Sequence, residues 1–571
     1  MAGTWQPISN PPGFNTSTMI LLTDGRIMVQ EEGTAHWHAL KPDAHGSYVN
    51  GTWSNLKDMS VWRRYYASAV LNDGRVLICG GEQSGSGSDI NKGEIYDPIA
   101  DSWTNMAVPP WTQVGDAASC TLPDGRVLIG ALLSGDCLIY DPATDAWSKA
   151  GAQSGRTNEE TWVLLPDNTI VTAQCFTPFK GQKYVISNDS WQDEGALPIT
   201  LVDPVMSEVG PGMLLYTGKV IFFGAANSNG HGKTVLYTPP GTPTGVGTWT
   251  AGPDIPKVGG QIMVCNDCPA TLLPNGKVLV TVAQFENNAW GTPVYFFEYD
   301  PASNTLVQAP TPTNNATYPY AQYPGIYWSR TMLLPTGQVL FSASSASVQC
   351  YTPDGIPAES WRPTISSIQS HGLIVTDYLL LQGTQLTGLS QANIYGDDVY
   401  PATNYPVVRF ENTNTHAAYF GRSYAFSTRA VATGAAVQSC RVDVREVPDG
   451  SYDVTVIANG ISSHPMSLLL RKFHKPELID VKYKWEIEIT GKEIVEGDPW
   501  KWWETVVDPV IGELQGEINA LRNTVRTLES LIRTSQLPEV GRRVAEAARL
   551  SAADIAKDRH SDEKPKEKPK K

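Results

Sequence analysis

The chain lacks several features that mark common protein classes. Only 18% of its 571 residues are charged, and 58 Asp and Glu against 43 Lys and Arg leave a net charge of -15. Nucleic-acid binding is therefore not expected, because phosphate contacts need clustered Lys and Arg. No apolar run reaches the ~18 residues of a membrane-spanning helix. The opening residues lack a basic segment followed by an apolar one, so we expect no secretory signal and a cytoplasmic location.

Cysteine is also scarce, with eight residues spread thinly along the chain. This spacing is typical of reduced, buried thiols and not of a disulfide framework. Cys265 and Cys268 form one C-x-x-C pair, but no second pair is near enough for structural zinc, and a strand-like run follows where a thioredoxin-type site needs a helix. We interpret the pair as structural or incidental, with a redox-labile pair as the alternative.

Glycine, proline and tryptophan are abundant, at 50, 41 and 17 residues. Helices tolerate Gly and Pro poorly, whereas short strands joined by tight turns need them, so most of the chain is predicted to be β.

One phrase recurs seven times in the first 350 residues: an apolar pair, a turn dipeptide and a β-forming run, as in LLTDGRIMV. Asp-Gly and Asn-Gly favour tight hairpin turns, and the spacing of 43 to 61 residues is that of a four-stranded propeller blade. The turn residues are Asp24, Asp73, Asp124, Asp167, Thr217, Asn275 and Thr336.

A second phrase, Tyr-Asp-Pro or Tyr-Thr-Pro followed in several copies by Trp, comes after several of these turns, for example Tyr96 with Trp103 and Tyr140 with Trp147. With these motifs the chain resembles the bacterial kelch-repeat proteins of the galactose oxidase and glyoxal oxidase type. The predicted fold is mainly β: a seven-bladed kelch propeller over 1–362 and an immunoglobulin-like (E-set) sandwich over 363–474. An array of β-sandwiches is the alternative.

The remaining chain is charged and helical in character. We predict a Trp-rich connector over 475–508, a coiled-coil helix over 509–535, and a short helix with a disordered charged tail over 536–571. β-Branched residues at position a and Leu at position d favour a parallel homodimer, with a helix docked on its own propeller as the alternative. The seam is Ile511, Leu514, Ile518, Leu521, Val525, Leu528 and Ile532.

The resemblance also implies a copper-radical site, which this chain matches only in part. Tyr66, Tyr327 and His416 match family phrases, but Trp328 stands where the resemblance implies a histidine ligand. Gln30 and its neighbour stand where a cross-linked cysteine is implied. Copper(II) is best held by two imidazoles, so we expect no copper and predict no cofactor and no metal site, with Ca²⁺ as the alternative, and we interpret the matched residues as relics.

A second set of residues lies seven to nine positions before the turns, where inner strands enter the propeller mouth. Carboxylates and phenols that converge there could bind sugar hydroxyls or Ca²⁺, act as an acid/base pair, or simply bond to the backbone of neighbouring blades. The predicted mouth residues are Tyr66, Asp116, Glu160, Glu208, Asp267 and Tyr327, with His416 from the second domain.

The sequence therefore predicts a non-catalytic binding or scaffolding protein. We expect a carbohydrate or protein ligand at the propeller mouth, and oligomers formed through the C-terminal helix. Two enzymatic alternatives stay open: a diverged copper-radical oxidase, and a carboxylate-dependent glycoside hydrolase or lyase.

Overall fold

The computed structural model describes residues 3–83, 89–202, 207–228, 230–286, 289–312, 326–370, 378–395 and 401–472. In these ranges helix occurs only as three 3-10 turns, η1 (Ile186–Asn188), η2 (Ile326–Trp328) and η3 (Glu359–Trp361), and no helix is long and apolar enough to cross a membrane. The mainly β prediction is confirmed. The connector, the coiled coil and the charged tail lie outside the described residues and stay predictions.

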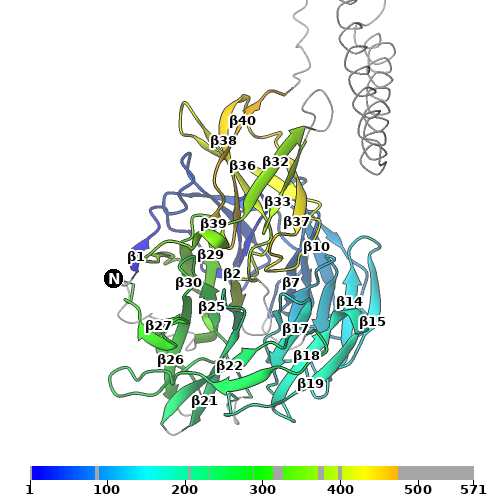
Figure 1. The fold of residues 1–571 in the computed structure, drawn as a ribbon, viewed down its shortest axis with the longest axis vertical. Coiled ribbons are helices and arrows are strands. Elements are labelled where there is room, and N and C mark those ends of the chain that lie inside the picture. Colours follow the sequence, from blue (N-terminus) through cyan, green and yellow to red (C-terminus); the bar gives the residue numbers. More distant parts are fainter. Residues whose placement is uncertain are drawn as a thin grey trace, which may run out of the picture. The chain divides into compact units, whose positions relative to one another are not determined.

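Seven antiparallel blades form the propeller, as predicted (Figure 1). Inner strands of most neighbouring blades contact one another, and β2 (Thr16–Leu21) of blade 1 contacts β29 (Ser329–Leu333) of blade 7. From inside to outside the blades are β2 (Thr16–Leu21), β3 (Ile27–Glu31), β4 (Trp37–Lys41), β5 (Thr52–Leu56); β7 (Ala67–Val70), β8 (Val76–Cys79), β10 (Gly93–Asp97), β11 (Ser102–Asn105); β12 (Ser119–Thr121), β13 (Val127–Gly130), β14 (Cys137–Asp141), β15 (Ala146–Ala150); β16 (Val163–Leu164), β17 (Thr169–Ala173), β18 (Lys180–Val185), β19 (Ser190–Ala196); β20 (Gly212–Leu214), β21 (Val220–Ser228), β22 (His231–Thr238), β23 (Thr248–Ala251); β25 (Pro269–Leu272), β26 (Val278–Glu286), β27 (Ala289–Asp300), β28 (Thr305–Gln308); and β29 (Ser329–Leu333), β30 (Val339–Ala343), β31 (Gln349–Thr352), β1 (Thr4–Pro7).

The N-terminal strand β1 closes the ring, a connection that the sequence left open. It pairs antiparallel with β31 and supplies the outer strand of blade 7. The Trp5 indole packs 4.7 Å from the Phe296 ring of blade 6 and 4.8 Å from the Tyr351 ring of its own blade. Its Nε1 donates to the Pro310 carbonyl at 2.7 Å. The first residues thus join blade 7 to blade 6.

The recurring turn dipeptide has the conformation that its sequence predicts. Gly74, for example, has φ +82°, and its N–H donates to the Leu71 carbonyl at 2.9 Å. The preceding Asp73 accepts from the Arg75 backbone at 3.0 Å and from Arg75 Nε at 2.7 Å. Glycine suits this position because it adopts positive φ without steric cost.

The Tyr and Trp of the second phrase help to connect several blades to their neighbours. In blade 2 the Tyr96 hydroxyl donates to Asp101 Oδ1 at 2.8 Å. The same oxygen accepts from the Lys57 backbone N–H of blade 1 at 2.8 Å, and Trp103 Nε1 donates to the Lys57 carbonyl at 2.8 Å. Tyr140 with Asp145 and Tyr184 with Asp189 repeat the contact in blades 3 and 4.

Replacing Tyr96 by Phe is expected to lower the free energy of unfolding by about 1 kcal/mol, because it removes one hydrogen bond and leaves the packing intact. Urea unfolding followed by intrinsic fluorescence measures the change. Tyr419→Phe, a half-buried tyrosine of the second β region, is the control. Equal stability of Tyr96→Phe and the wild type would contradict a role for this contact.

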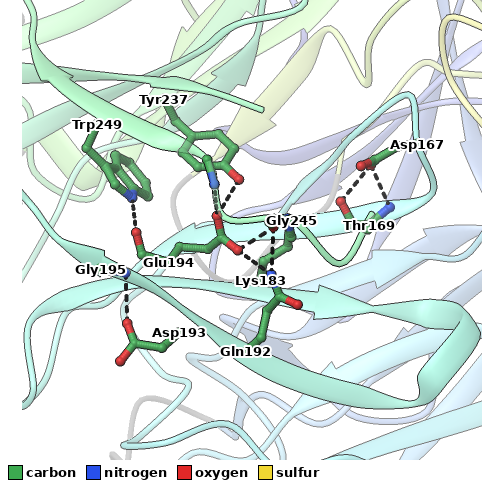
Figure 2. Close-up of polar contacts among 11 residues, drawn as sticks. Asp167, Thr169, Lys183, Gln192, Asp193, Glu194, Gly195, Tyr237, Gly245 and Trp249 are labelled. Atoms are coloured by element: carbon green, nitrogen blue, oxygen red, sulfur yellow. Dashed lines mark hydrogen bonds and ion pairs between the residues drawn. The ribbon is translucent and has the colours of Figure 1, made fainter. Parts of the chain in front are cut away.

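Blade 5 has a longer outer turn and takes its carboxylate from blade 4 (Figure 2). Glu194 of β19 accepts from the Tyr237 hydroxyl at 2.7 Å and from the Gly247 N–H at 2.7 Å. The Lys183 ammonium lies 3.2 Å from the same carboxylate, and both side chains are fully buried. In blade 7, Tyr351 donates to Glu298 of blade 6 at 2.6 Å. In blade 5 the buried Lys183–Glu194 ion pair thus replaces the aspartate that blades 2, 3 and 4 supply themselves.

A second β region follows the propeller (Figure 1). β36 pairs with β35 through its first half and with β37 through its second half, which joins two groups of strands. Cores of both regions merge, since Leu21 and Tyr405 belong to one cluster of buried residues. An immunoglobulin-like topology stays a prediction. The strands are β32 (Thr364–Ser370), β33 (Tyr378–Thr384), β35 (Val407–Asn412), β36 (Ala418–Tyr424), β37 (Val437–Asp443), β38 (Gly450–Ala458), β39 (Ile461–Ser462) and β40 (Met466–Leu470).

The second β region contacts the propeller face that carries the recurring turns. Arg422 Nη1 donates to the Asp73 carbonyl at 2.6 Å, and the Arg429 N–H donates to the Pro123 carbonyl at 2.8 Å. Because a blade's strands alternate in direction, the inner strands begin at the opposite face. The strand entries predicted to form the mouth therefore lie away from this contact.

One segment of the second β region, residues 390–395 and 401–405, bonds to the inner strands of several blades. Within it β34 (Asn393–Tyr395) pairs with β25 of blade 6. A segment that bonds to inner strands on several sides must lie inside the ring. Its other bonds are Ser390 Oγ to the Leu214 carbonyl (2.8 Å), the Leu164 N–H to Gln391 Oε1 (2.9 Å), Asn393 Nδ2 to the Thr331 carbonyl (2.9 Å) and the Tyr405 hydroxyl to the Leu21 carbonyl (2.5 Å).

Candidate ligand site at the propeller mouth

Five blades place a non-glycine residue with left-handed backbone where the inner strand begins. Such a conformation is costly for residues with a side chain, and it clusters at functional sites. All five side chains are half-buried. The residues are Tyr65 (φ 54°), Asp116 (φ 38°), Glu159 (φ 58°), Ser207 (φ 58°) and Asp267 (φ 44°).

Backbone hydrogen bonds connect the residues at the start of the inner strands in neighbouring blades. The Asp116 N–H donates to the Tyr65 carbonyl at 3.1 Å, and the Glu159 N–H donates to the Asp116 carbonyl at 3.4 Å. On the other side, the Asp267 N–H donates to the Val209 carbonyl at 3.0 Å. The shared conformation therefore accompanies the backbone bonds between neighbouring blades, and it places a half-buried polar or aromatic residue at each of these five strand entries.

The Arg64 side chain is the centre of an aromatic group at this mouth. Its guanidinium lies 5.0 Å from the Tyr65 ring, 5.3 Å from the Trp328 ring and 5.9 Å from the Trp62 ring. The Tyr327 ring lies 5.0 Å from that of Trp328. Blades 2 and 7, on either side of blade 1, thus contribute to one cluster. Arginine stacked on several rings is held in one orientation.

Carboxylates surround this cation without hydrogen-bonding to it. Glu82 and Glu32 lie 3.7 and 3.9 Å from its nitrogens, beyond hydrogen-bond length. Arg64 Nε and Trp62 Nε1 are buried donors with no hydrogen-bond partner among the residues that the structure describes. Burial and the nearby Glu82 raise the pKa of Asp89 to about 6. The site therefore offers aromatic faces, unused donors and acidic acceptors.

Asp267 and Tyr327, both predicted from the sequence, belong to this site. Burial raises the pKa of Tyr327; Trp328 and the Arg64 charge lower it, and the Asp267 and Glu32 carboxylates raise it. Burial also raises the pKa of Tyr65, on which the charges of Arg64 and Asp267 act in opposite directions. The Asp267 carboxylate of blade 6 therefore acts electrostatically on tyrosines of blades 2 and 7.

Three other predicted residues, Tyr66, Glu160 and Glu208, are buried inside their blades. The Tyr66 hydroxyl donates to Gln30 Oε1 at 2.7 Å. In each case the preceding residue has the left-handed backbone, which turns the following side chain away from the mouth. Sequence reasoning missed Tyr65 and Glu159 for this reason.

A stricter spacing would have found the missed positions. Tyr65, Asp116, Glu159 and Asp267 each lie eight residues before the turn residue of their blade, whereas Ser207 lies ten before Thr217. The predicted set mixed offsets of seven to nine, and one residue changes the direction of a side chain at a strand entry.

His416 does not meet the other predicted residues. It lies on the loop between β35 and β36 with its side chain 72% exposed, and its Nδ1 is 3.2 Å from Glu411 Oε1. Its carbonyl oxygen is 3.2 Å from Nδ1 of His45, which belongs to an outer turn on the face that contacts the second β region. Tyr66 and Tyr327 lie at the strand entries of the opposite face.

The residues matched to a copper site do not assemble a copper donor set. Tyr66 directs its hydroxyl to an amide, His416 lies at the other end of the propeller, and Trp328 offers no lone pair. Within the described ranges, no three His, Cys, Asp or Glu side chains form a group that could hold a metal ion. Copper(II) in a square-based site needs nitrogen ligands, and the described residues of this mouth do not bring such ligands together.

Glu160 should make stability depend on pH. Burial raises its pKa from 4.5 to about 8, although hydrogen bonds from Thr172 and Gln153 oppose the shift. The native state then holds a proton that the unfolded state releases, so stability falls as pH rises from about 5 to 8. Between pH 6 and 8 the loss is expected to reach about 2 kcal/mol.

Glu160→Gln removes this titration, so its urea midpoint should fall less over that pH interval. Glu159→Gln, the half-buried neighbour, is the control and should keep the wild-type dependence. Parallel pH profiles for wild type and Glu160→Gln would contradict the assignment.

Comparison with known protein families identifies a kelch motif over residues 63–107, which covers strands β7 to β11 of blade 2. Galactose oxidase from Gibberella zeae is 35% identical over 83 residues, which are 14% of this chain and 11% of that protein. An F-box/kelch-repeat protein of Arabidopsis thaliana is 22% identical over 242 residues, 35% of this chain and 48% of that protein. The chain therefore matches about a tenth of the length of the first relative and about half of the length of the second.

Among solved structures, a fungal alcohol oxidase of the AA5 family in complex with copper matches with a TM-score of 0.48 and 15% identity, covering 82% of this chain and all of that one. The kelch motif, the similarity to galactose oxidase and the seven blades together confirm the resemblance to kelch-repeat proteins of the galactose oxidase type.

Proposed function

We propose that this chain is a non-catalytic binding protein and that its ligand, a carbohydrate, is held at the propeller mouth. The observation that carries the proposal is the Arg64 guanidinium, fixed between three aromatic rings with a buried Nε that no described residue accepts from. A sugar ring has apolar C–H faces that stack on aromatic rings and hydroxyls that accept from Arg and Trp and donate to carboxylates. Trp62 and Asp267 supply such groups beside Arg64.

A glycan array probed with the full chain, with and without Ca²⁺, tests this proposal. We expect binding to a restricted set of glycans, independent of Ca²⁺, and a strongly reduced signal for Asp267→Ala. Asp254→Ala, a carboxylate of blade 5 paired with Lys233, is the matched control. Binding that Asp267→Ala leaves unchanged would argue against the mouth.

A protein ligand is the second candidate, favoured by exposed apolar side chains on the same face. Leu133 is 64% exposed and Phe179 is 49% exposed, each on the loop between the second and third strands of its blade. The enzymatic alternatives have less support, since Glu160 is bonded inside its blade and the copper donors are dispersed. Copper in the purified protein, together with peroxide formed from alcohols or aldehydes, would support the oxidase alternative.

We also propose that the chain is a parallel dimer through residues 509–535, which would make its ligand binding multivalent. The support is the heptad pattern of the sequence. Removing 509–571 should halve the mass measured by light scattering, whereas removing only 536–571 should leave it unchanged. An unaltered mass after the longer deletion would refute the coiled coil.

A further inference from the structure

The Cys265–Cys268 turn lies at the mouth, between two short strands that share a partner. β24 (Met263–Val264) ends just before it, β25 begins just after it, and both pair with β26. Between the two pairings β26 supplies only Thr281 and Val282, opposite the five residues 265–269. The surplus residues must leave the sheet as a bulge, which brings the two cysteines together at its base.

The two thiols share one hydrogen-bond acceptor. Cys265 Sγ and Cys268 Sγ lie 3.5 and 3.4 Å from the Thr281 carbonyl oxygen. Both residues are fully buried and reduced. Burial raises the pKa of Cys265, and the neighbouring Cys268 thiol raises it further. The shared acceptor thus holds the two sulfurs close together at the base of the bulge.

We propose that Cys265 and Cys268 are a redox modification site that closes into an intrachain disulfide by exchange with a small-molecule disulfide. One protein thiolate attacks a sulfur of the reagent and expels one reagent thiol. The second protein thiolate attacks the mixed disulfide and expels the other. The two protein thiols lose two protons and two electrons, and the reagent disulfide is reduced to two thiols. Cysteines separated by two residues form disulfides in the C-x-x-C motifs of disulfide oxidoreductases.

Formation of the Cys265–Cys268 disulfide would change the ligand site, a consequence that rests on the proposed function. Asp267 lies between the two cysteines with φ 44°, and its N–H donates to Val209 of blade 5. Oxidation replaces the two Thr281 contacts by a covalent tie at the base of the bulge. The Asp267 carboxylate, whose charge acts on Tyr65 and Tyr327, then changes its position and its range of motion. We expect ligand affinity to differ between the two forms by about fivefold or more.

Peptide mapping of the full chain tests the modification directly. The folded protein is incubated at mildly alkaline pH with oxidised glutathione or with dithiothreitol, then unfolded, alkylated and digested with trypsin. We expect the peptide between Lys257 and Lys277 to lose both alkyl groups and two hydrogen atoms after oxidation only. Cys440→Ala, which removes a lone buried thiol of β37, should keep this result, whereas Cys268→Ser should abolish it.

Two alkylated cysteines in that peptide after oxidation, or closure only in unfolded protein, would overturn the proposal. Affinity for an array-selected glycan is then measured in both forms, with Cys268→Ser expected to be indifferent to the oxidant. Equal affinities would overturn the effect on the mouth. A chain that binds no glycan would overturn the proposed function, while the peptide result would still decide the disulfide.

Discussion

Replacing Glu194 by Ala is expected to lower the free energy of unfolding by about 3–5 kcal/mol, because it leaves the buried Lys183 ammonium without its counter-charge. Both side chains are fully buried, with 3.2 Å between Nζ and Oε1. The substitution also removes the acceptor of the Tyr237 hydroxyl and of the Gly247 N–H, both 2.7 Å away (Figure 2). Since these donors belong to blade 5, the contact between blades 4 and 5 should weaken.

The adjacent carboxylate provides a matched control. Asp193, also on β19, pairs with Lys180 at the surface and has a 55% exposed side chain, so Asp193→Ala should cost at most about 1 kcal/mol. Urea unfolding measures both changes. The double variant Lys183→Met/Glu194→Leu should recover much of the loss, since it removes both buried charges. Similar costs for the two single substitutions would contradict this account.

Replacing Arg64 by Ala is expected to weaken ligand binding about 10- to 100-fold. A hydrogen bond from a charged group contributes about 1.5–3 kcal/mol, and each 1.4 kcal/mol is about a factor of ten in affinity. The substitution also removes the side chain that stacks against Trp62, Tyr65 and Trp328. Isothermal titration calorimetry with an array-selected glycan gives the affinity.

Two further variants separate binding from folding. Arg64→Lys keeps the charge but loses the planar stacking surface, so its affinity should be intermediate. Arg126→Ala removes an arginine that pairs with Asp124 at a turn of the opposite face, and it should bind as the wild type does. Weakening by Arg126→Ala as large as that by Arg64→Ala would show that the loss reflects folding and not the mouth.

The propeller could be predicted because its information is local. Each turn, such as Asp73 with its glycine, indicates one blade, and so do the Tyr and Trp of the outer strands. Seven repeats of these motifs indicate a closed ring. Closure by β1 could not be predicted, since the pairing of Trp5 with Tyr351 joins residues at the two ends of the propeller. Glu194 was likewise missed, because its partners Lys183 and Tyr237 lie in two different blades.

The sequence predicted the position of the site better than it predicted the residues that form it. The sequence located the strand entries and selected Asp116, Asp267 and Tyr327, but it selected Tyr66 where the structure directs Tyr65 to the mouth. A left-handed residue changes which of two neighbouring side chains points inward, and the Tyr-Tyr pair alone does not report this, although the spacing of eight residues to the turn does. Arg64 was missed because its role depends on Trp328, a residue of blade 7.

A crystal structure of the chain with an array-selected glycan tests the central claim most directly, because it locates the ligand. We expect a sugar ring stacked on the aromatic group of the mouth, with a hydroxyl accepting a hydrogen bond from Arg64 and another donating to a carboxylate beside it. A glycan bound on the outer strands of the blades or on the second β region, with the Arg64 group unoccupied, would contradict the account.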